Sequence, residues 1–204
     1  MPHQLALTAP LTLTQRLVLG ATSLFGWQFR MEEPLPSRCV IIGAPHTTNW
    51  DLLAALVVRG ASGMPINWIA KDAIFKGPGN WFFRKLGGIP VNRRSKNNFV
   101  EQMVALFAEK KEMILAIAPQ GTRSVQTHWR SGFYYMAMGA KVPIALGYAD
   151  YVKKIVGIGP IMQPSGDLQA DFERIKAFYA DIVGRHPHLN GEIQPQEKKE
   201  SATD

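Results

Sequence analysis

The sequence predicts a single α/β domain with a mostly parallel or mixed central sheet flanked by helices. Short apolar runs alternate along the chain with segments whose apolar residues recur at helical spacing, and this alternation is typical of strands joined by crossover helices. The length of 204 residues and a hydrophobic content of 46% fit one domain with a sizeable core. Folds of this class usually place their sites at strand ends, so functional residues are expected in those loops.

Strands are predicted where short apolar runs are bounded by turn residues. These runs are Cys39–Ile42, Ile66–Ala70, Ile89–Asn92, Met113–Ala118, Val142–Tyr148 and Ile155–Gly159. Helical spacing falls between most of them, at Asp51–Arg59, Gly79–Leu86, Asn97–Lys110, Phe133–Met138 and Asp167–Val183. The last of these carries Phe172, Ile175 and Tyr179 on one stripe, which predicts that it packs on the sheet.

The N-terminal segment, residues 1–30, is predicted to contain an apolar or amphipathic helix. Its apolar run, Leu17–Trp27, is shorter than the roughly 20 residues that span a bilayer. It also lacks the basic leader and small-residue cleavage site of a secretory signal. With Arg16 and Arg30 on its flanks, the segment fits two alternatives: a helix lying in a membrane interface or a helix packed on the protein body.

The remaining chain divides into a main domain, residues 31–185, and a tail, residues 186–204. The tail is polar and is predicted to be flexible, without a chemical role. The single cysteine, Cys39, cannot form an internal disulfide, and its apolar surroundings predict a buried packing residue. The histidines do not form a ligand set at any metal-site spacing, so no metal is expected.

The charge balance limits the classes of partner. A formal net charge of +7 favours polyanions, which include anionic lipid headgroups, nucleic acids and phosphorylated substrates. The sequence has no RNP-like motif, zinc-ligand spacing or basic helix with heptads, so a nucleic-acid-binding protein rests on net charge alone. Nucleic acid is therefore not expected as a partner.

A histidine and an aspartate lie five positions apart in the segment Gly43–Asp51, between an apolar run and a predicted helix. A base and a carboxylate on one strand-to-helix turn can share a hydrogen bond, which fixes one imidazole tautomer and lets it take a proton from a hydroxyl. The pair His46 and Asp51 is therefore a candidate acid/base dyad. A purely structural role, closing a loop and capping a helix, is the alternative.

Three further segments follow in order along the chain. They are Lys71–Arg93, Ala118–Ser124 and Val142–Leu146. With the first, they resemble the four sequence blocks of the glycerolipid acyltransferase family, whose best-known members are the 1-acylglycerol-3-phosphate (lysophosphatidic acid) acyltransferases. The resemblance spans about residues 38–150. It implies that His46 is the general base and that Asp51 orients it, with direct attack by the acceptor hydroxyl and no acyl-enzyme.

The second block is expected to bind the acceptor. Arg93 matches the arginine that ends this block in the family, and a guanidinium there can grip a phosphate through two parallel hydrogen bonds. Arg94 and Lys71 are further candidates. Asn92 and Pro90 stand where the family usually has Asp and Phe, which weakens any transfer of headgroup specificity.

The third block supplies Gln120, Gly121, Thr122 and Arg123, and Arg130 follows it. We expect Gly121 to let the backbone approach a ligand, Thr122 to offer a hydroxyl, and the two arginines to bind phosphate. Gln120 stands where the family usually has Glu, so the length and acceptor oxygen are kept but the charge is lost. A shifted acceptor, lower activity and a binding protein without turnover all remain open.

These residues lead to the hypothesis of a peripheral enzyme at the cytoplasmic face of the membrane. It would move a fatty acyl group from acyl-CoA or acyl carrier protein to a hydroxyl of a lysophospholipid, with 1-acylglycerol-3-phosphate as the default acceptor and an anionic membrane surface as partner. No bound cofactor is expected, because the thioester is a co-substrate. The rival hypothesis is an acyl-lipid-binding accessory protein without turnover, motivated by Gln120.

Overall fold

The structure is a computed structural model that describes residues 4–5, 10–91, 99–122 and 124–196. Its strands are β1 (Gln4–Leu5), β2 (Gln28–Met31), β3 (Arg38–Ala44), β4 (Ile66–Lys71), β5 (Gly88–Val91), β6 (Met113–Ile117), β7 (Ile144–Asp150) and β8 (Ile155–Met162). Its helices are α1 (Leu13–Leu24), α2 (Trp50–Ser62), α3 (Asn80–Lys85), α4 (Phe99–Glu109), α5 (Gly132–Ala140) and α6 (Leu168–Tyr179), with short 3₁₀ turns at Asp72–Phe75 and Pro187–Leu189.

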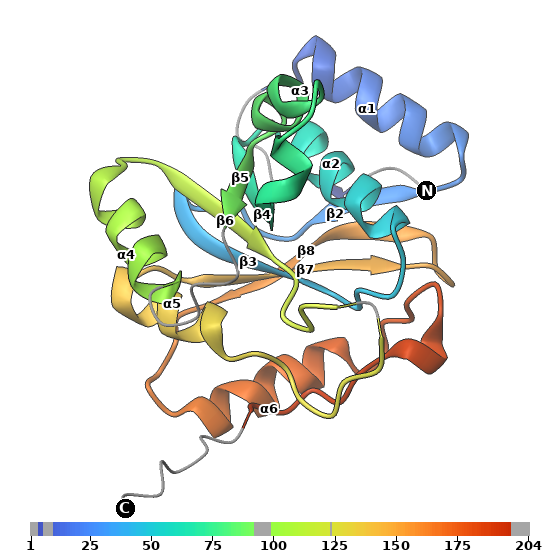
Figure 1. Cartoon of the computed structure of the whole chain (residues 1–204). Helices are drawn as coiled ribbons and strands as arrows, with labels where there is room; N and C mark the ends of the chain where they lie inside the picture. The colour runs from blue at the N-terminus through green and yellow to red at the C-terminus, as the bar shows by residue number, and fades with distance from the viewer. Residues whose placement is uncertain (1–3, 6–9, 92–98, 123, 197–204) are drawn as a thin grey trace, which may run out of the picture.

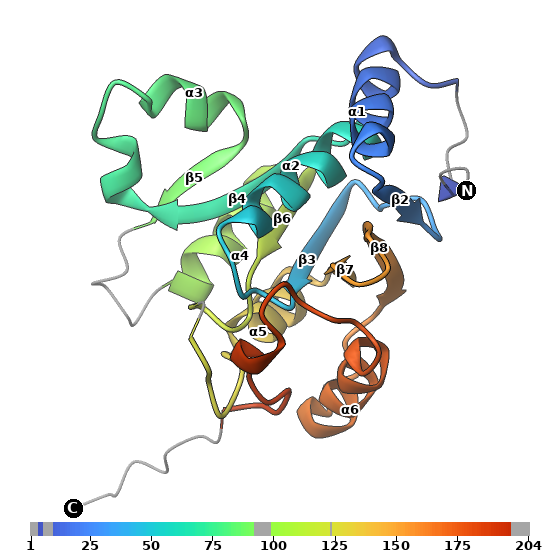
Figure 2. The same ribbon diagram turned by 90° about the vertical axis from the view of Figure 1, so that its right-hand side faces the viewer.

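The strands of the described residues form one eight-stranded sheet in the order β1-β2-β8-β7-β3-β6-β4-β5. All neighbouring pairs are parallel except β7 and β8, which form an antiparallel hairpin. Helices cover both faces, so the molecule has three layers (Figures 1 and 2). This arrangement confirms the predicted α/β class with a mixed sheet.

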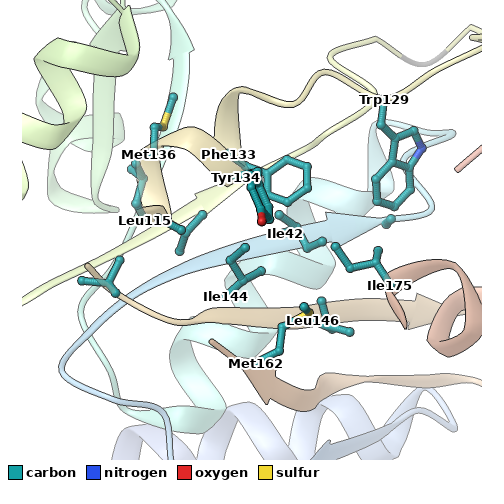
Figure 3. Packing of buried hydrophobic residues seen from close by; sticks show 14 of the residues in the cluster. Ile42, Leu115, Trp129, Phe133, Tyr134, Met136, Ile144, Leu146, Met162 and Ile175 are labelled. Atoms are coloured by element: carbon teal, nitrogen blue, oxygen red, sulfur yellow. The ribbon is translucent and has the colours of Figure 1, made fainter. Parts of the chain in front are cut away.

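The sheet separates two hydrophobic cores. The larger lies between the sheet and helices α4, α5 and α6, where aromatic rings such as Phe133 and Trp129 pack over Ile42 and Leu146 (Figure 3). The smaller lies between the sheet and helices α1 and α2. Because β3 and β7 are central, their residues are buried on both faces and read as continuous apolar runs.

The cysteine lies in the smaller core, as the sequence predicted. Cys39 is fully buried in β3, and burial raises the pKa of its thiol to about 12. Because the thiolate is the reactive form, this side chain is an inert packing residue at neutral pH.

The N-terminal segment contains a helix, α1, and after it a strand that was not predicted from the sequence. α1 is packed on the body through α2, where the side chain of Val18 lies against the backbone at Gly60. The chain then turns into β2, which pairs with β8 at the register Phe29 to Val156. Four residues of alternating burial are too short to show in the sequence pattern. Within the described residues, no helix combines the length and apolarity needed to cross a bilayer.

The segment predicted as a flexible tail is bound to the body over its described part, residues 186–196, which corrects that prediction. Its backbone exchanges hydrogen bonds with the loop that follows β6, including Trp129 N–H to Gln194 O at 2.9 Å and Gln196 N–H to Trp129 O at 3.2 Å. The polar composition was misleading because main-chain hydrogen bonds, together with the packing of Ile193 against the larger core, hold this segment.

A buried carboxylate joins α5 to the start of α6. Asp171 is 1% exposed, and its Oδ2 accepts hydrogen bonds from the Tyr134 hydroxyl and from the backbone N–H and hydroxyl of Ser165. Burial alone would raise the pKa of Asp171, but these hydrogen bonds and the Arg174 guanidinium outweigh it and lower the pKa below 3.8. The charged form therefore stabilises the fold.

Substituting Asp171→Asn tests this network. We expect the free energy of unfolding at pH 7 to fall by about 2 kcal/mol, the scale of lost hydrogen bonds to a charged group. The lowered pKa means that this contribution is present above pH 3.8 and is lost as the pH falls through the lower pKa of the folded state. Urea denaturation across this range should therefore show the difference between the two proteins shrinking in acid.

The matched control is Asp167→Asn, on the same helix. Asp167 is the N-cap of α6 and accepts a hydrogen bond from Ala170 N–H, a role that Asn fills as well as Asp. An Asp171→Asn protein as stable as this control at neutral pH would contradict the assigned role.

Candidate active site

The loop between β3 and α2 brings the predicted dyad together. His46 Nδ1 lies 3.2 Å from Asp51 Oδ2, and the two side chains are 27% and 9% exposed. The histidine therefore has one ring nitrogen facing the carboxylate and part of its ring open to solvent. This geometry stabilises the tautomer that carries its proton on Nδ1, so that Nε2 presents a lone pair.

The Asp51 carboxylate is held by four neighbours. Oδ2 also accepts hydrogen bonds from the backbone N–H groups of Thr47 and Thr48, each at 2.9 Å, and Oδ1 accepts one from the Tyr151 hydroxyl at 2.8 Å. Burial raises the pKa of Asp51, but the hydrogen bonds from His46, Thr48 and Tyr151 outweigh it and lower that pKa below its ordinary value. Asp51 is therefore ionised when it faces the imidazole.

The hydroxyl oxygens of the two threonines both accept hydrogen bonds from the backbone. Thr47 Oγ1 accepts a hydrogen bond from the backbone N–H of His186, and Thr48 Oγ1 accepts one from Trp50 N–H. Both residues are buried. Both hydroxyl oxygens are therefore occupied in contacts that hold the loop.

The side chain of Gln120 contacts the backbone of His46. It is 3% exposed, and its Oε1 accepts a hydrogen bond from the backbone N–H of His46 at 2.7 Å. A cavity of about 80 Å³ lies beside this contact and is lined in part by Pro45 and Trp129. Through this contact Gln120, which was predicted to bind substrate, supports the loop that carries His46.

Gly121 and Arg130 meet at the turn after β6. Gly121 has a φ of +69°, and its N–H donates to Ala118 O at 3.0 Å, which closes a tight turn. A side chain at Gly121 would lie 2.9 Å from Nε of Arg130, so the arginine side chain lies directly over the glycine. Thr122 Oγ1 lies 3.0 Å from Ser124 Oγ, within the same loop.

The structure describes only some of the remaining residues that were predicted to bind substrate. Arg93, Arg94 and Arg123 lie outside the described residues. Lys71 is the last residue of β4, and its backbone lies at the same edge of the sheet as the ends of β3 and β6. The site therefore brings together His46, Asp51, Gln120, Gly121 and Arg130, from the loops after two adjacent parallel strands.

Two residues near the dyad were not predicted. Tyr151 contacts Asp51, and the guanidinium of Arg185 lies over the ring of Trp50 at 5.6 Å. Both lie outside the four sequence blocks. For Tyr151 the available signal was topological, because the end of a predicted strand parallel to β3 lies beside the loop that follows β3. No sequence signal marked Arg185.

In the described ranges, no group of three or more His, Cys, Asp or Glu side chains is placed to hold a metal ion. The arrangement is that of an imidazole base, a fixed carboxylate and nearby cationic side chains, which suits proton abstraction from a hydroxyl.

Comparison with known proteins identifies the family. The sequence model described as Acyltransferase matches residues 27–145, which is more than half of the chain. The chain belongs to the acyltransferase family. It is accordingly an enzyme that transfers an acyl group, and the block resemblance predicted from the sequence is confirmed at the level of the family. No protein of curated function matched the sequence.

A solved structure shares the fold of this acyltransferase. It is the 1-acyl-sn-glycerophosphate (LPA) acyltransferase PlsC from Thermotoga maritima, which is similar with a TM-score of 0.55 and 17% sequence identity. The match covers 83% of this chain and 75% of that chain. At this identity the likeness concerns the fold, which is the α/β arrangement described above.

Replacing Gln120 tests its role under His46. In Gln120→Leu the backbone N–H of His46 loses its acceptor in a buried position, so we expect the free energy of unfolding to fall by about 1–3 kcal/mol. Gln120→Glu keeps an acceptor oxygen at the same reach and should cost less. Chemical denaturation at pH 7 measures both variants.

The control is Gln169→Leu on the exposed side of α6, where the change should stay within about 0.5 kcal/mol. If Gln120→Leu were no more destabilising than this control, the hydrogen bond to His46 would not be supporting the loop.

Proposed function

We propose that this acyltransferase moves a fatty acyl group from a thioester, carried by CoA or acyl carrier protein, to a hydroxyl of a lysophospholipid. The default acceptor is 1-acylglycerol-3-phosphate, which is an acceptor of the kind named for the structurally similar Thermotoga enzyme. The observation that carries the proposal is the pairing of His46 Nδ1 with the ionised Asp51 at a partly exposed position. The proposal includes no metal or bound cofactor, because the thioester is a co-substrate.

In the proposed reaction, Nε2 of His46 removes the proton from the acceptor hydroxyl as its oxygen attacks the thioester carbonyl carbon. Asp51 stabilises the imidazolium that forms. Collapse of the tetrahedral intermediate breaks the carbon–sulfur bond, and the imidazolium returns its proton to the leaving thiolate. The products are an ester and a free thiol, with the histidine restored and no acyl-enzyme formed.

The arginines supply the proposed phosphate contacts. Arg130 is exposed and lies over the Gly121 turn at the same edge as the dyad. Arg93, Arg94, Arg123 and Lys71 are proposed from the sequence blocks alone. A guanidinium binds a phosphate through paired, charge-assisted hydrogen bonds, which would fix the acceptor with its hydroxyl toward the base.

Labelled acyl-CoA or acyl carrier protein and a panel of lysolipids test the reaction. We expect transfer to 1-acylglycerol-3-phosphate, weaker transfer to a monoacylglycerol that lacks the phosphate, and a loss of about 10³-fold or more in kcat with His46→Ala. The matched control is His128→Ala, which removes a loop histidine that contacts Thr127. Thioester binding without transfer to any acceptor would favour the accessory-protein hypothesis, and activity that survives His46→Ala would remove the proposed base.

A peripheral position at the cytoplasmic face of the membrane is part of the proposal. Helices α1, α2 and α3 gather at the upper end of the molecule in both Figures 1 and 2. Each carries exposed apolar side chains, and we call this set the apolar surface: Leu13, Leu17, Leu24, Trp50, Leu52, Leu53, Trp81 and Phe82. The first turn of α2 carries both Trp50 and the dyad's Asp51, so a bilayer on this surface would bring lipid close to the base.

The charge beside these side chains suits an anionic bilayer. Arg84 and Lys85 are exposed on α3, and Lys85 Nζ lies 5.0 Å from the centre of the Trp81 ring. An aromatic residue with an adjacent cation is typical of membrane interfaces, where the ring enters the headgroup region and the cation meets lipid phosphate.

Vesicle binding tests the surface. Substituting both Trp81 and Phe82 by Ser should weaken binding to phosphatidylglycerol-containing vesicles by about 10-fold or more. The reason is that two large apolar side chains would no longer be buried in the bilayer when the protein binds. The same double change at Tyr135 and Met138, exposed on α5 across the sheet, should have little effect. Equal binding by the two double variants would contradict this surface.

A further inference from the structure

We infer that Tyr151 is a positioning residue that acts through Asp51 to keep the catalytic histidine aligned. The inference rests on the proposed function, because it assigns Tyr151 a part in the reaction that His46 and Asp51 are proposed to perform. Its basis is the hydrogen bond from the Tyr151 hydroxyl to Asp51 Oδ1 at 2.8 Å.

The carboxylate needs this contact because its other restraints act on one oxygen. Oδ2 faces Nδ1 of His46 and also accepts from the backbone N–H groups of Thr47 and Thr48. These contacts alone leave the carboxylate able to turn about Oδ2. A donor on Oδ1 restricts that rotation, so both oxygens are held and Oδ2 keeps its direction toward the imidazole.

The fold holds Tyr151 in place from two sides. In the sheet, Ala44 at the end of β3 pairs with Tyr148 in β7, so the residues that follow both strands lie at one edge. The backbone N–H of Tyr151 donates to Val183 O at 2.9 Å. The ring of Trp27 packs edge-on against the Tyr151 ring with the ring centres 5.1 Å apart. The hydrogen bond to Val183 and the contact with Trp27 therefore hold the Tyr151 hydroxyl beside Asp51.

The hydroxyl also remains a donor at the pH at which the dyad works. Burial, together with the hydrogen bond to Asp51, raises the pKa of Tyr151 above its ordinary value. A phenol in this state does not compete with His46 for protons. Its part is to donate one hydrogen bond to the Asp51 carboxylate, which favours the ionised form.

Tyr151→Phe removes this donor and keeps the ring that contacts Trp27. We expect kcat for acyl transfer to fall about 10-fold, the scale of a lost hydrogen bond to a charged group, with KM for both substrates changed by less than about 2-fold. In ¹³C NMR titration, the pKa of the Asp51 carboxyl should rise, because a hydrogen bond to its charged form has been lost. A role confined to packing of the Tyr151 ring would move neither that titration nor kcat.

The matched control is Tyr148→Phe, three residues earlier, whose ring contacts Phe178 rather than the dyad. It should leave kcat and the Asp51 titration unchanged. A second control repeats Tyr151→Phe in an Asp51→Asn background, where the further loss should be less than about 2-fold because the residue acts through the carboxylate. If Tyr151→Phe does not fold, as judged by thermal unfolding, Tyr151→Met removes the hydroxyl while refilling the half-buried space.

An unchanged kcat in Tyr151→Phe, an unchanged Asp51 titration, or an equal loss in the Asp51→Asn background would each overturn the inference. Its failure is distinguishable from failure of the proposed function. In the first case the wild-type protein transfers acyl groups and needs His46 but not Tyr151. In the second, the wild-type protein shows no transfer to any lysolipid, while the NMR titration still reports whether Tyr151 holds Asp51.

Discussion

Oδ2 of Asp51 is the atom on which the active loop depends. It accepts hydrogen bonds from two successive backbone N–H groups, of Thr47 and Thr48, while it faces the imidazole of His46. The hydrogen bonds from the Thr47 and Thr48 backbone fold the loop after β3 back toward Asp51, so that His46 lies beside the first turn of α2. A neutral side chain at position 51 would weaken both the loop and the dyad, so here the geometry of the chain and the chemistry of the site rest on the same charge.

Most of the sheet could be predicted because its strands are buried on both faces. β3, β6 and β7 read as short apolar runs bounded by turn residues, and the helices between successive strands indicate that the strands run mostly parallel. β2 could not be predicted, because four residues of alternating burial carry too little pattern. The described residues 186–196 were misassigned for a related reason: main-chain hydrogen bonds leave no signature in composition.

The candidate site was predictable where a local motif carries the chemistry. His46 and Asp51 are close in sequence, and a single turn brings them together. Gln120 was predicted to be a site residue, but its contact with the backbone of His46 was not predicted, because side-chain direction in a loop depends on long-range packing. Tyr151 lies 100 residues from Asp51 and reaches it only through strand pairing. No local pattern marks such a contact.

The contact between Thr47 and the backbone of His186 has a consequence for the order in which the protein is made. The loop that carries the base has a partner that is translated 139 residues later. A domain generally folds as a unit, and a contact within it forms only once both of its partners have been synthesised. β3 lacks its sheet neighbours β6 and β7 until they have been made, and the loop around His46 is completed only when the still more distant segment has emerged, so newly made enzyme matures last at the place where it acts.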